Sequence, residues 1–152
     1  MKSYHRIIFL GRSGNLAEPM AVELAKELFM DTQIEFLSRG LVVSFPEPMN
    51  PKAEAVLISN GVMVSNFVSA GFTEKDITPD TLILTMGQDI KARAQNSFPA
   101  IRSEQIEVLT DFVGEELEII DPYGGTLTAY GLCYESLKRT IKKLVKIINE
   151  GE

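Results

Sequence analysis

The fold is decided by residues 6–20, which read RIIFLGRSGNLAEPM. Residues 7–10 form a short apolar run, IIFL, with the composition of a buried β-strand. Two glycines follow in a loop, and Pro19 suits the first turn of a helix because proline lacks the N–H that would have no partner there. A strand, a loop and a helix in this order aim backbone N–H groups and the helix dipole at one point, which predicts an anion site.

Composition limits the classes of protein to which the chain can belong. Its 152 residues, 45% hydrophobic and 24% charged, are typical of one globular domain, which we expect to span residues 1–152. The net charge of −6 argues against a nucleic-acid partner. No apolar run approaches the roughly 20 residues that span a membrane, and no signal-peptide pattern opens the chain, so we expect a cytoplasmic protein without membrane contact.

One histidine, His5, and one cysteine, Cys133, leave no set of ligands for a multi-histidine or cysteine metal site. We therefore expect neither a metal nor a cofactor. Cys133 lies far along the chain on a predicted helix, where a free cysteine is usually a small buried hydrophobe.

Apolar runs and turn signals predict strands that alternate with helices. We expect strands at 7–10, 34–38, 81–86 and 106–109, and helices at 19–30, 51–59, 88–98 and 126–149, with a short helix from Thr73 and a long connection at 111–125. Such alternation predicts an α/β fold of three layers, in which helices flank both faces of a four-stranded parallel sheet. Ligands of these sheets bind at the carboxyl ends of the strands, so the loops that follow the strands should meet there.

The final predicted helix carries basic residues beside an apolar stripe. They are Lys138, Arg139, Lys142, Lys143 and Lys146. Charged outer faces are normal for amphipathic helices, and cations near a C-terminus complement the helix dipole. We therefore interpret this set as a solvated face and not as a nucleic-acid site.

Five short motifs, taken in order, resemble the low-molecular-weight protein tyrosine phosphatases in their bacterial form. They lie at 38–41, 48–53, 72–77, 82–86 and 121–125, and the similarity covers about residues 5–148. The last motif, Asp-Pro-Tyr-Gly-Gly, is similar to the loop that carries the general acid of that family. The resemblance therefore implies that Asp121 corresponds to the general acid, although the same five residues are also good turn sequence.

The resemblance also implies what residues 11–18 have lost. In that family a cysteine after the first strand attacks phosphorus, and an arginine six residues later binds the phosphate oxygens together with the loop amides. The family's loop reads Cys-x5-Arg-Ser-Pro. Aligning its proline with Pro19 places Gly11 at the cysteine, Ala17 at the arginine and Glu18 at the serine. The nucleophile and the anion-binding arginine are then both absent.

No neighbouring side chain is an evident replacement. The candidate phosphate-binding loop comprises Gly11, Arg12, Ser13, Gly14, Asn15, Leu16, Ala17 and Glu18. Ser13 would need an adjacent general base, and none lies nearby in the sequence. Arg12 lies five positions before the family's arginine. Three further residues, Phe45, Met49 and Tyr123, are candidates for the pocket rim, and each is as plausible as an ordinary packing residue.

Two classes of function follow. The first is a pseudophosphatase, a binding or regulatory protein that recognises a phosphoprotein, a small anion or another protein, as a monomer or weak homodimer. The alternative is an active phosphatase with non-standard chemistry that uses Asp121 and a water molecule. Loss of the nucleophile lowered turnover roughly 10⁶-fold in another enzyme, which favours the first class. Phosphotransfer subunits and arsenate reductases with a similar sheet also need the missing cysteine.

Overall fold

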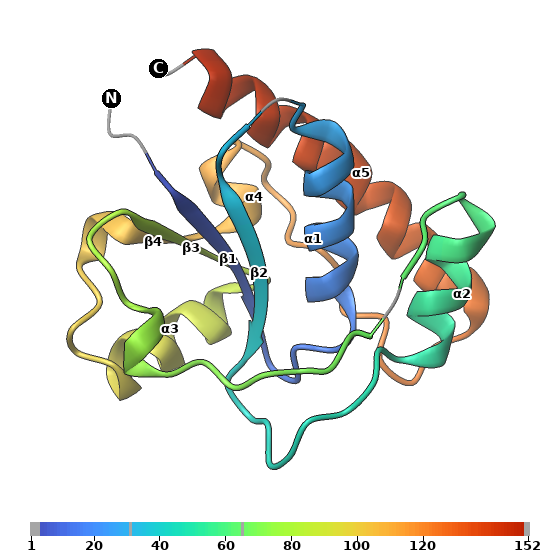
Figure 1. Cartoon of the computed structure of the whole chain (residues 1–152), viewed down its shortest axis with the longest axis horizontal. Coiled ribbons are helices and arrows are strands. Elements are labelled where there is room, and N and C mark those ends of the chain that lie inside the picture. The colour runs from blue at the N-terminus through green and yellow to red at the C-terminus, as the bar shows by residue number, and fades with distance from the viewer. Residues whose placement is uncertain (1–3, 31, 65, 151–152) are drawn as a thin grey trace.

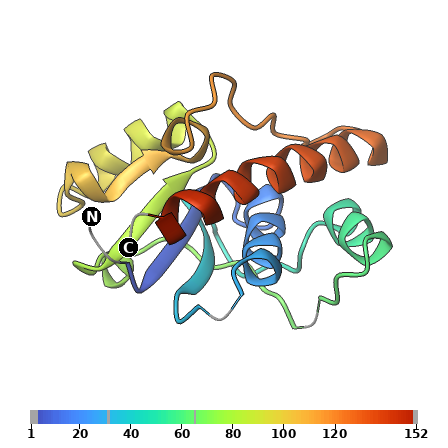
Figure 2. The same ribbon diagram turned by 90° about the horizontal axis from the view of Figure 1, so that it is seen from above.

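The computed structural model describes residues 4–30, 32–64 and 66–150, and in these residues it has a central sheet between two layers of helices (Figures 1 and 2). Four parallel strands make the sheet within the described ranges, in the order β2-β1-β3-β4. They are β1 (Arg6–Gly11), β2 (Glu35–Gly40), β3 (Thr81–Thr85) and β4 (Ile106–Val108). The predicted α/β fold is confirmed, and the predicted domain ends at 1–3 and 151–152 lie outside the described residues.

The helices divide between the two faces of the sheet. The α-helices described are α1 (Ala17–Leu28), α2 (Pro51–Ser59), α3 (Gln88–Ser97), α4 (Leu109–Phe112) and α5 (Leu127–Glu150). Residues of α1, α2 and α5 join the larger apolar core, and residues of α3 join a smaller core on the other face. None of the described helices is long and apolar enough to cross a membrane.

Residues 7–10 of strand β1 are all apolar because their side chains alternate between the two cores. Ile7 and Phe9 point into the larger core, and Ile8 and Leu10 point into the smaller one. All four are completely buried, as expected for an inner strand of a parallel sheet with helices on both faces. This packing fixes the strand, and with it the place where the following loop begins.

Several element ends differ from the sequence-based predictions. Helix α1 begins at Ala17, before Pro19, and ends at Leu28. Strand β2 extends to Gly40, beyond its predicted end at 38, because its last two residues continue the parallel ladder with β1. The predicted strand end at Leu109 is instead the first residue of α4.

The helix predicted from Thr73 is only a 3₁₀ turn, Glu74–Asp76. The Thr73 N–H donates to the Asp76 carboxylate at 2.9 Å, which closes the turn at once. A second 3₁₀ turn, Ser103–Gln105, precedes β4.

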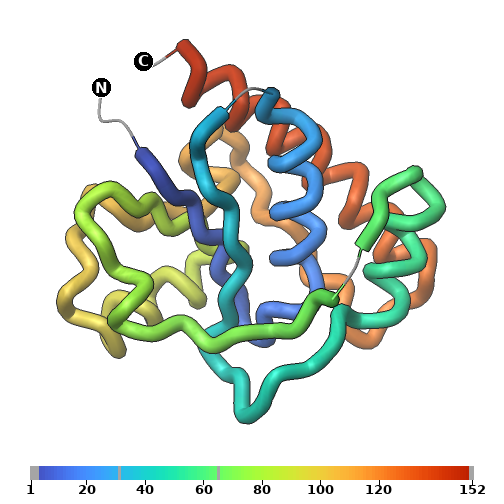
Figure 3. Tube along the Cα trace, in the orientation of Figure 1, coloured from blue at the N-terminus to red at the C-terminus, as the bar shows by residue number. Residues whose placement is uncertain are grey.

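Connecting segments gather at the carboxyl ends of the strands. In Figure 3 the loops after β1 and β2 and the end of the connection before α5 lie at one end of the molecule, away from the described ends of the chain. The predicted meeting of these loops is therefore observed, and it positions the candidate site.

Candidate functional site

The loop between β1 and α1 is held firmly at the edge of the sheet. Its carbonyl groups at Gly11, Arg12 and Asn15 accept hydrogen bonds of 3.0, 2.8 and 2.9 Å from backbone N–H groups within residues 41–50. Gly14 has a φ of 75°, which favours glycine, and a Cβ there would lie 2.9 Å from backbone nitrogen of β2. The turn therefore has a fixed shape, in contact with the end of β2.

Glu18 turns its side chain back into the hollow of this loop. Its Oε1 accepts a hydrogen bond from the Leu16 N–H at 3.1 Å, and the residue is only 4% exposed. A Cβ built on Gly11 would lie 1.6 Å from Glu18 Oε2. The Glu18 carboxyl group therefore occupies the space into which any side chain at position 11 would project.

Burial dominates the electrostatics of this carboxyl group. It raises the pKa of Glu18 to about 7, against the opposing effect of hydrogen bonds from the Glu18 and Leu16 N–H groups, and the charge of Asp121 raises the pKa further. The first turn of a helix otherwise favours a negative charge. The result is a buried acid that exchanges its proton near neutral pH.

A cavity of about 290 Å³ opens beside Glu18, between the loop, the start of α3 and the connection before α5. It is lined by Arg12, Leu16, Ala17, Glu18, Met86, Gly87, Asp89, Ile90, Arg93, Glu118, Ile119 and Asp121. Glu118 accepts a hydrogen bond from the Gln88 N–H at 2.9 Å, which ties the connection to the N-terminus of α3.

The lining of this cavity carries more acidic than basic side chains, so an anion beside it would depend on the loop amides for its binding. No group of three or more His, Cys, Asp and Glu side chains in the described part of the chain could hold a metal ion.

Asp121, which the resemblance assigns as the general acid, lies in the wall of this cavity beside the loop that follows β1. Its Oδ1 accepts a hydrogen bond from the Tyr123 N–H at 3.0 Å. This bond belongs to the turn that the sequence of residues 121–125 also indicates. Burial raises the pKa of Tyr130 and of Cys133 on α5, and the charge of Asp121 adds to both shifts. Asp121 therefore acts electrostatically on the loop and on α5.

Cys133 is 4% exposed, so its predicted role as a buried small hydrophobe is confirmed. Burial raises the pKa of its thiol to about 12, and the charges of Asp121 and Glu18 contribute. Because the thiolate is the nucleophilic form, a thiol with this pKa is nearly inert at neutral pH. The charges of Asp121 and Glu18 act on Cys133, but its thiol is too weakly acidic to replace the missing nucleophile.

Two other candidates in the loop have different surroundings. The Ser13 Oγ is buried and has no hydrogen-bond partner among the described residues, so no general base there activates it. Arg12 is exposed and lines the cavity.

The three predicted rim residues divide. Met49 is 4% exposed, packs in the larger core and does not line the cavity beside Glu18, so a rim role for it stays a prediction. Phe45 and Tyr123 are 67% and 77% exposed, but neither lines the cavity beside Glu18. A rim role for these two stays a prediction.

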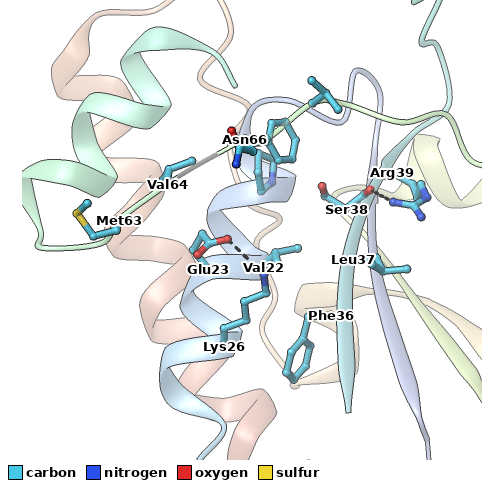
Figure 4. A pocket seen from close by; sticks show the side chains of 13 residues that line it. Val22, Glu23, Lys26, Phe36, Leu37, Ser38, Arg39, Met63, Val64 and Asn66 are labelled. Atoms are coloured by element: carbon cyan, nitrogen blue, oxygen red, sulfur yellow. Dashed lines mark hydrogen bonds and ion pairs between the residues drawn. The ribbon is translucent and has the colours of Figure 1, made fainter. Parts of the chain in front are cut away.

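A second cavity, of about 400 Å³, lies between α1, β2 and residues 63–64 and 66–68 (Figure 4). Lys26 pairs with Glu23 at 3.7 Å, and Arg39 Nη1 donates to the Ser38 carbonyl at 2.8 Å. The charges of this larger cavity are paired, and none of the predicted site residues lines it, whereas several line the cavity beside Glu18. The smaller cavity is therefore the better candidate.

Comparison with known proteins decides the family. Residues 10–152 match the family model described as low molecular weight phosphotyrosine protein phosphatase. The chain belongs to this family. The low molecular weight protein-tyrosine-phosphatase PtpB of Staphylococcus aureus is 32% identical to this phosphatase-family chain over 143 residues, which cover 94% of this chain and 99% of that protein.

Solved structures agree on the fold. A low molecular weight protein tyrosine phosphatase from T. tengcongensis is 27% identical, with a TM-score of 0.85 and coverage of 93% of this chain and 97% of that one. The YwlE arginine phosphatase from Geobacillus stearothermophilus has a TM-score of 0.88 at 24% identity, with coverage of 97% and 94%, and so supports the fold alone.

Sequence reasoning missed three charged residues of the cavity, Asp89, Arg93 and Glu118. Asp89 and Arg93 come soon after β3, whose carboxyl end lies at the same edge of the sheet as that of β1. Their positions in the sequence therefore indicate a place near the site. Glu118 gave no local signal, because its place depends on the path of an irregular connection.

Proposed function

We propose that this member of the low-molecular-weight phosphatase family is catalytically impaired and acts by binding, as a pseudophosphatase. The observation that carries the proposal is the position of Glu18. Its carboxyl group lies where a side chain at position 11 would project, 1.6 Å from the Cβ that Gly11 lacks. The same carboxyl group accepts a hydrogen bond from the Leu16 N–H, a donor that an external oxyanion bound in this loop would use.

The alignment of the loop at Pro19 supports the same conclusion. It assigns Gly11 to the nucleophile and Ala17 to the arginine, and neither residue has a side chain able to do that chemistry. An arginine that binds phosphate contributes charge-assisted hydrogen bonds of about 1.5–3 kcal/mol each. The raised pKa of the Cys133 thiol, to about 12, argues against a substitute nucleophile from α5.

The ligand class that fits this proposal is a phosphoprotein or a small anion. The Staphylococcus aureus relative is named for phosphotyrosine in proteins, and the loop retains backbone N–H groups at the start of α1. In this proposal the loop amides, and not a nucleophile, provide recognition.

The alternative is an active phosphatase with Asp121 as the acid and a water molecule as the nucleophile. The place of Asp121 in the wall of the cavity and the phosphatase names of the relatives favour this second candidate.

An assay with an aryl phosphate separates the two candidates. We expect no turnover by the wild-type chain above the rate without protein. Turnover that Asp121→Asn abolishes would instead establish the alternative and overturn the proposal. Stability of the Asp121→Asn variant should be measured alongside, since Asp121 also accepts the Tyr123 N–H.

A gain-of-function series makes the test sharper. The triple variant Gly11→Cys, Ala17→Arg, Glu18→Ser should hydrolyse the aryl phosphate. The pair Gly11→Cys, Ala17→Arg should be much slower, because the new Cβ must displace Glu18 and the remaining carboxylate opposes the bound phosphate. Equal rates for the pair and the triple variant would contradict the role assigned to Glu18.

A further inference from the structure

The hollow of the loop already contains an acidic group of the chain itself. Glu18 Oε1 accepts the Leu16 N–H at 3.1 Å at the N-terminus of α1, and only 4% of the residue is exposed. Helix N-termini bind anions because several N–H groups there have no partner within the helix. Glu18 therefore stands in the position of the anion that such a loop would bind.

The neighbouring cavity gives this side chain somewhere to go. Glu18 lines the cavity of about 290 Å³, and its carboxyl group lies against Gly11 on the side of the loop. A flexible glutamate can change rotamer into such a space without movement of the backbone. The backbone of the loop is itself fixed by the hydrogen bonds from residues 41–50, so the hollow keeps its shape when the side chain leaves.

We propose that Glu18 is a displaceable internal ligand that closes the loop against external oxyanions, and that an oxyanion binds only when the Glu18 side chain has moved out of the hollow. This inference rests on the binding role proposed above and adds the regulation of that site.

The closed position of Glu18 requires glycine at position 11. Any Cβ there would lie 1.6 Å from Glu18 Oε2, so a closed loop and a side chain at position 11 exclude each other. The missing nucleophile and the internal carboxyl group are thus two parts of one arrangement.

The charge on Glu18 controls how firmly the loop is closed. Burial raises its pKa to about 7, so the closed position favours the neutral acid, and the side chain leaves this position more easily when it is ionised, above about pH 7. The charged and titratable groups that line the cavity or act on Glu18 are Arg12, Asp89, Arg93, Glu118, Asp121 and Cys133. Glu18 is the one among them that takes a loop N–H, so its titration is the one that opens the hollow.

Sulfate is the suitable probe because it remains a dianion across the pH range in which Glu18 titrates. Calorimetric titration of the full chain with sulfate should be carried out at about pH 8 and at about pH 6. The variants are Glu18→Ser and Glu18→Gln, and the control is Glu27→Ser, an equal change of charge at an exposed position of the same helix. Thermal unfolding should be recorded for each variant.

We expect Glu18→Ser to bind sulfate roughly tenfold to a hundredfold more tightly than wild type at about pH 8, the range that one charge-assisted hydrogen bond corresponds to. Wild-type affinity should fall as pH falls to about 6, because protonation of Glu18 favours the closed position. Glu18→Gln should lose most of this pH dependence, and Glu27→Ser should behave as wild type.

Equal sulfate affinity for wild type and Glu18→Ser at about pH 8 would overturn the inference, and so would absence of binding in every protein. Equal affinity would leave the proposed anion-binding role standing, whereas absence of binding in every protein would count against that role as well. Catalytic impairment is tested separately by the aryl phosphate assay. If Glu18→Ser does not fold, a wild-type affinity that does not change with pH would overturn the inference by itself.

Discussion

Replacing Glu18 by glutamine should stabilise the protein at alkaline pH and have little effect at acid pH. Glutamine has nearly the same shape, and its carbonyl oxygen can still accept the Leu16 N–H. What the substitution removes is the ability of a fully buried group to become charged. The effect on stability should therefore depend on pH in a way that a simple packing change would not.

The size of the effect follows from the pKa of Glu18, which burial raises from 4.5 to about 7 on folding. Because the folded state holds the proton more tightly, the stability due to this group is fully present below about pH 4.5. It is lost as pH rises, and the loss is complete above about pH 7. Each pH unit in that interval corresponds to about 1.4 kcal/mol, so wild type should lose about 3 kcal/mol relative to Glu18→Gln.

Urea unfolding of wild type and Glu18→Gln at about pH 4.5 and at about pH 8 measures this directly. The difference in unfolding free energy between the two proteins should change by about 3 kcal/mol between the two conditions. Glu27→Gln, an exposed position on the same helix, is the matched control and should give a nearly constant difference. A Glu18→Gln difference that is equal at both pH values would refute the reasoning about the buried acid.

Two further predictions concern the neighbours of Glu18. Gly11→Ala should destabilise the chain by about 1–2 kcal/mol because its Cβ must displace Glu18 Oε2. The loss should largely disappear in a Glu18→Ser background. Additive changes in unfolding free energy in this double-mutant cycle would show that the two positions do not interact. The raised pKa of the Cys133 thiol, about 12, predicts labelling by a disulfide reagent about a thousandfold slower in the native chain than in urea at about pH 8, and rapid native labelling would contradict its burial.

Local patterns predicted much of the fold. The apolar runs of β1 and β3 are fully buried strands, and the Asn50-Pro51 start of α2 is capped by the Asn50 side chain, which accepts from the Lys52 N–H at 2.9 Å. Most errors lie at element ends, as at β2, where the sheet extends the strand to Gly40, and one concerns element type, because the helix predicted from Thr73 is only a 3₁₀ turn. Pairing with a neighbouring strand is a long-range effect that a local pattern does not contain.

The candidate site was predicted only in part. The loop at 11–18 and Asp121 do lie together, but Met49 belongs to the core, and α3 contributes Asp89 and Arg93 to the cavity. Apolar loop residues give no sign of whether they face a pocket or the interior, because both environments favour the same side chains.

The sequence by itself determined the order of strands and helices, the place of the loop after the first strand and the family to which the chain belongs. These properties are carried by contiguous residues, such as the apolar run before Gly11 and the proline at 19. Only the tertiary structure decided that Glu18 turns into the loop. An acid in the first turn of a helix is equally favourable pointing to solvent, and the close approach of the loop at Gly11 is what encloses this one.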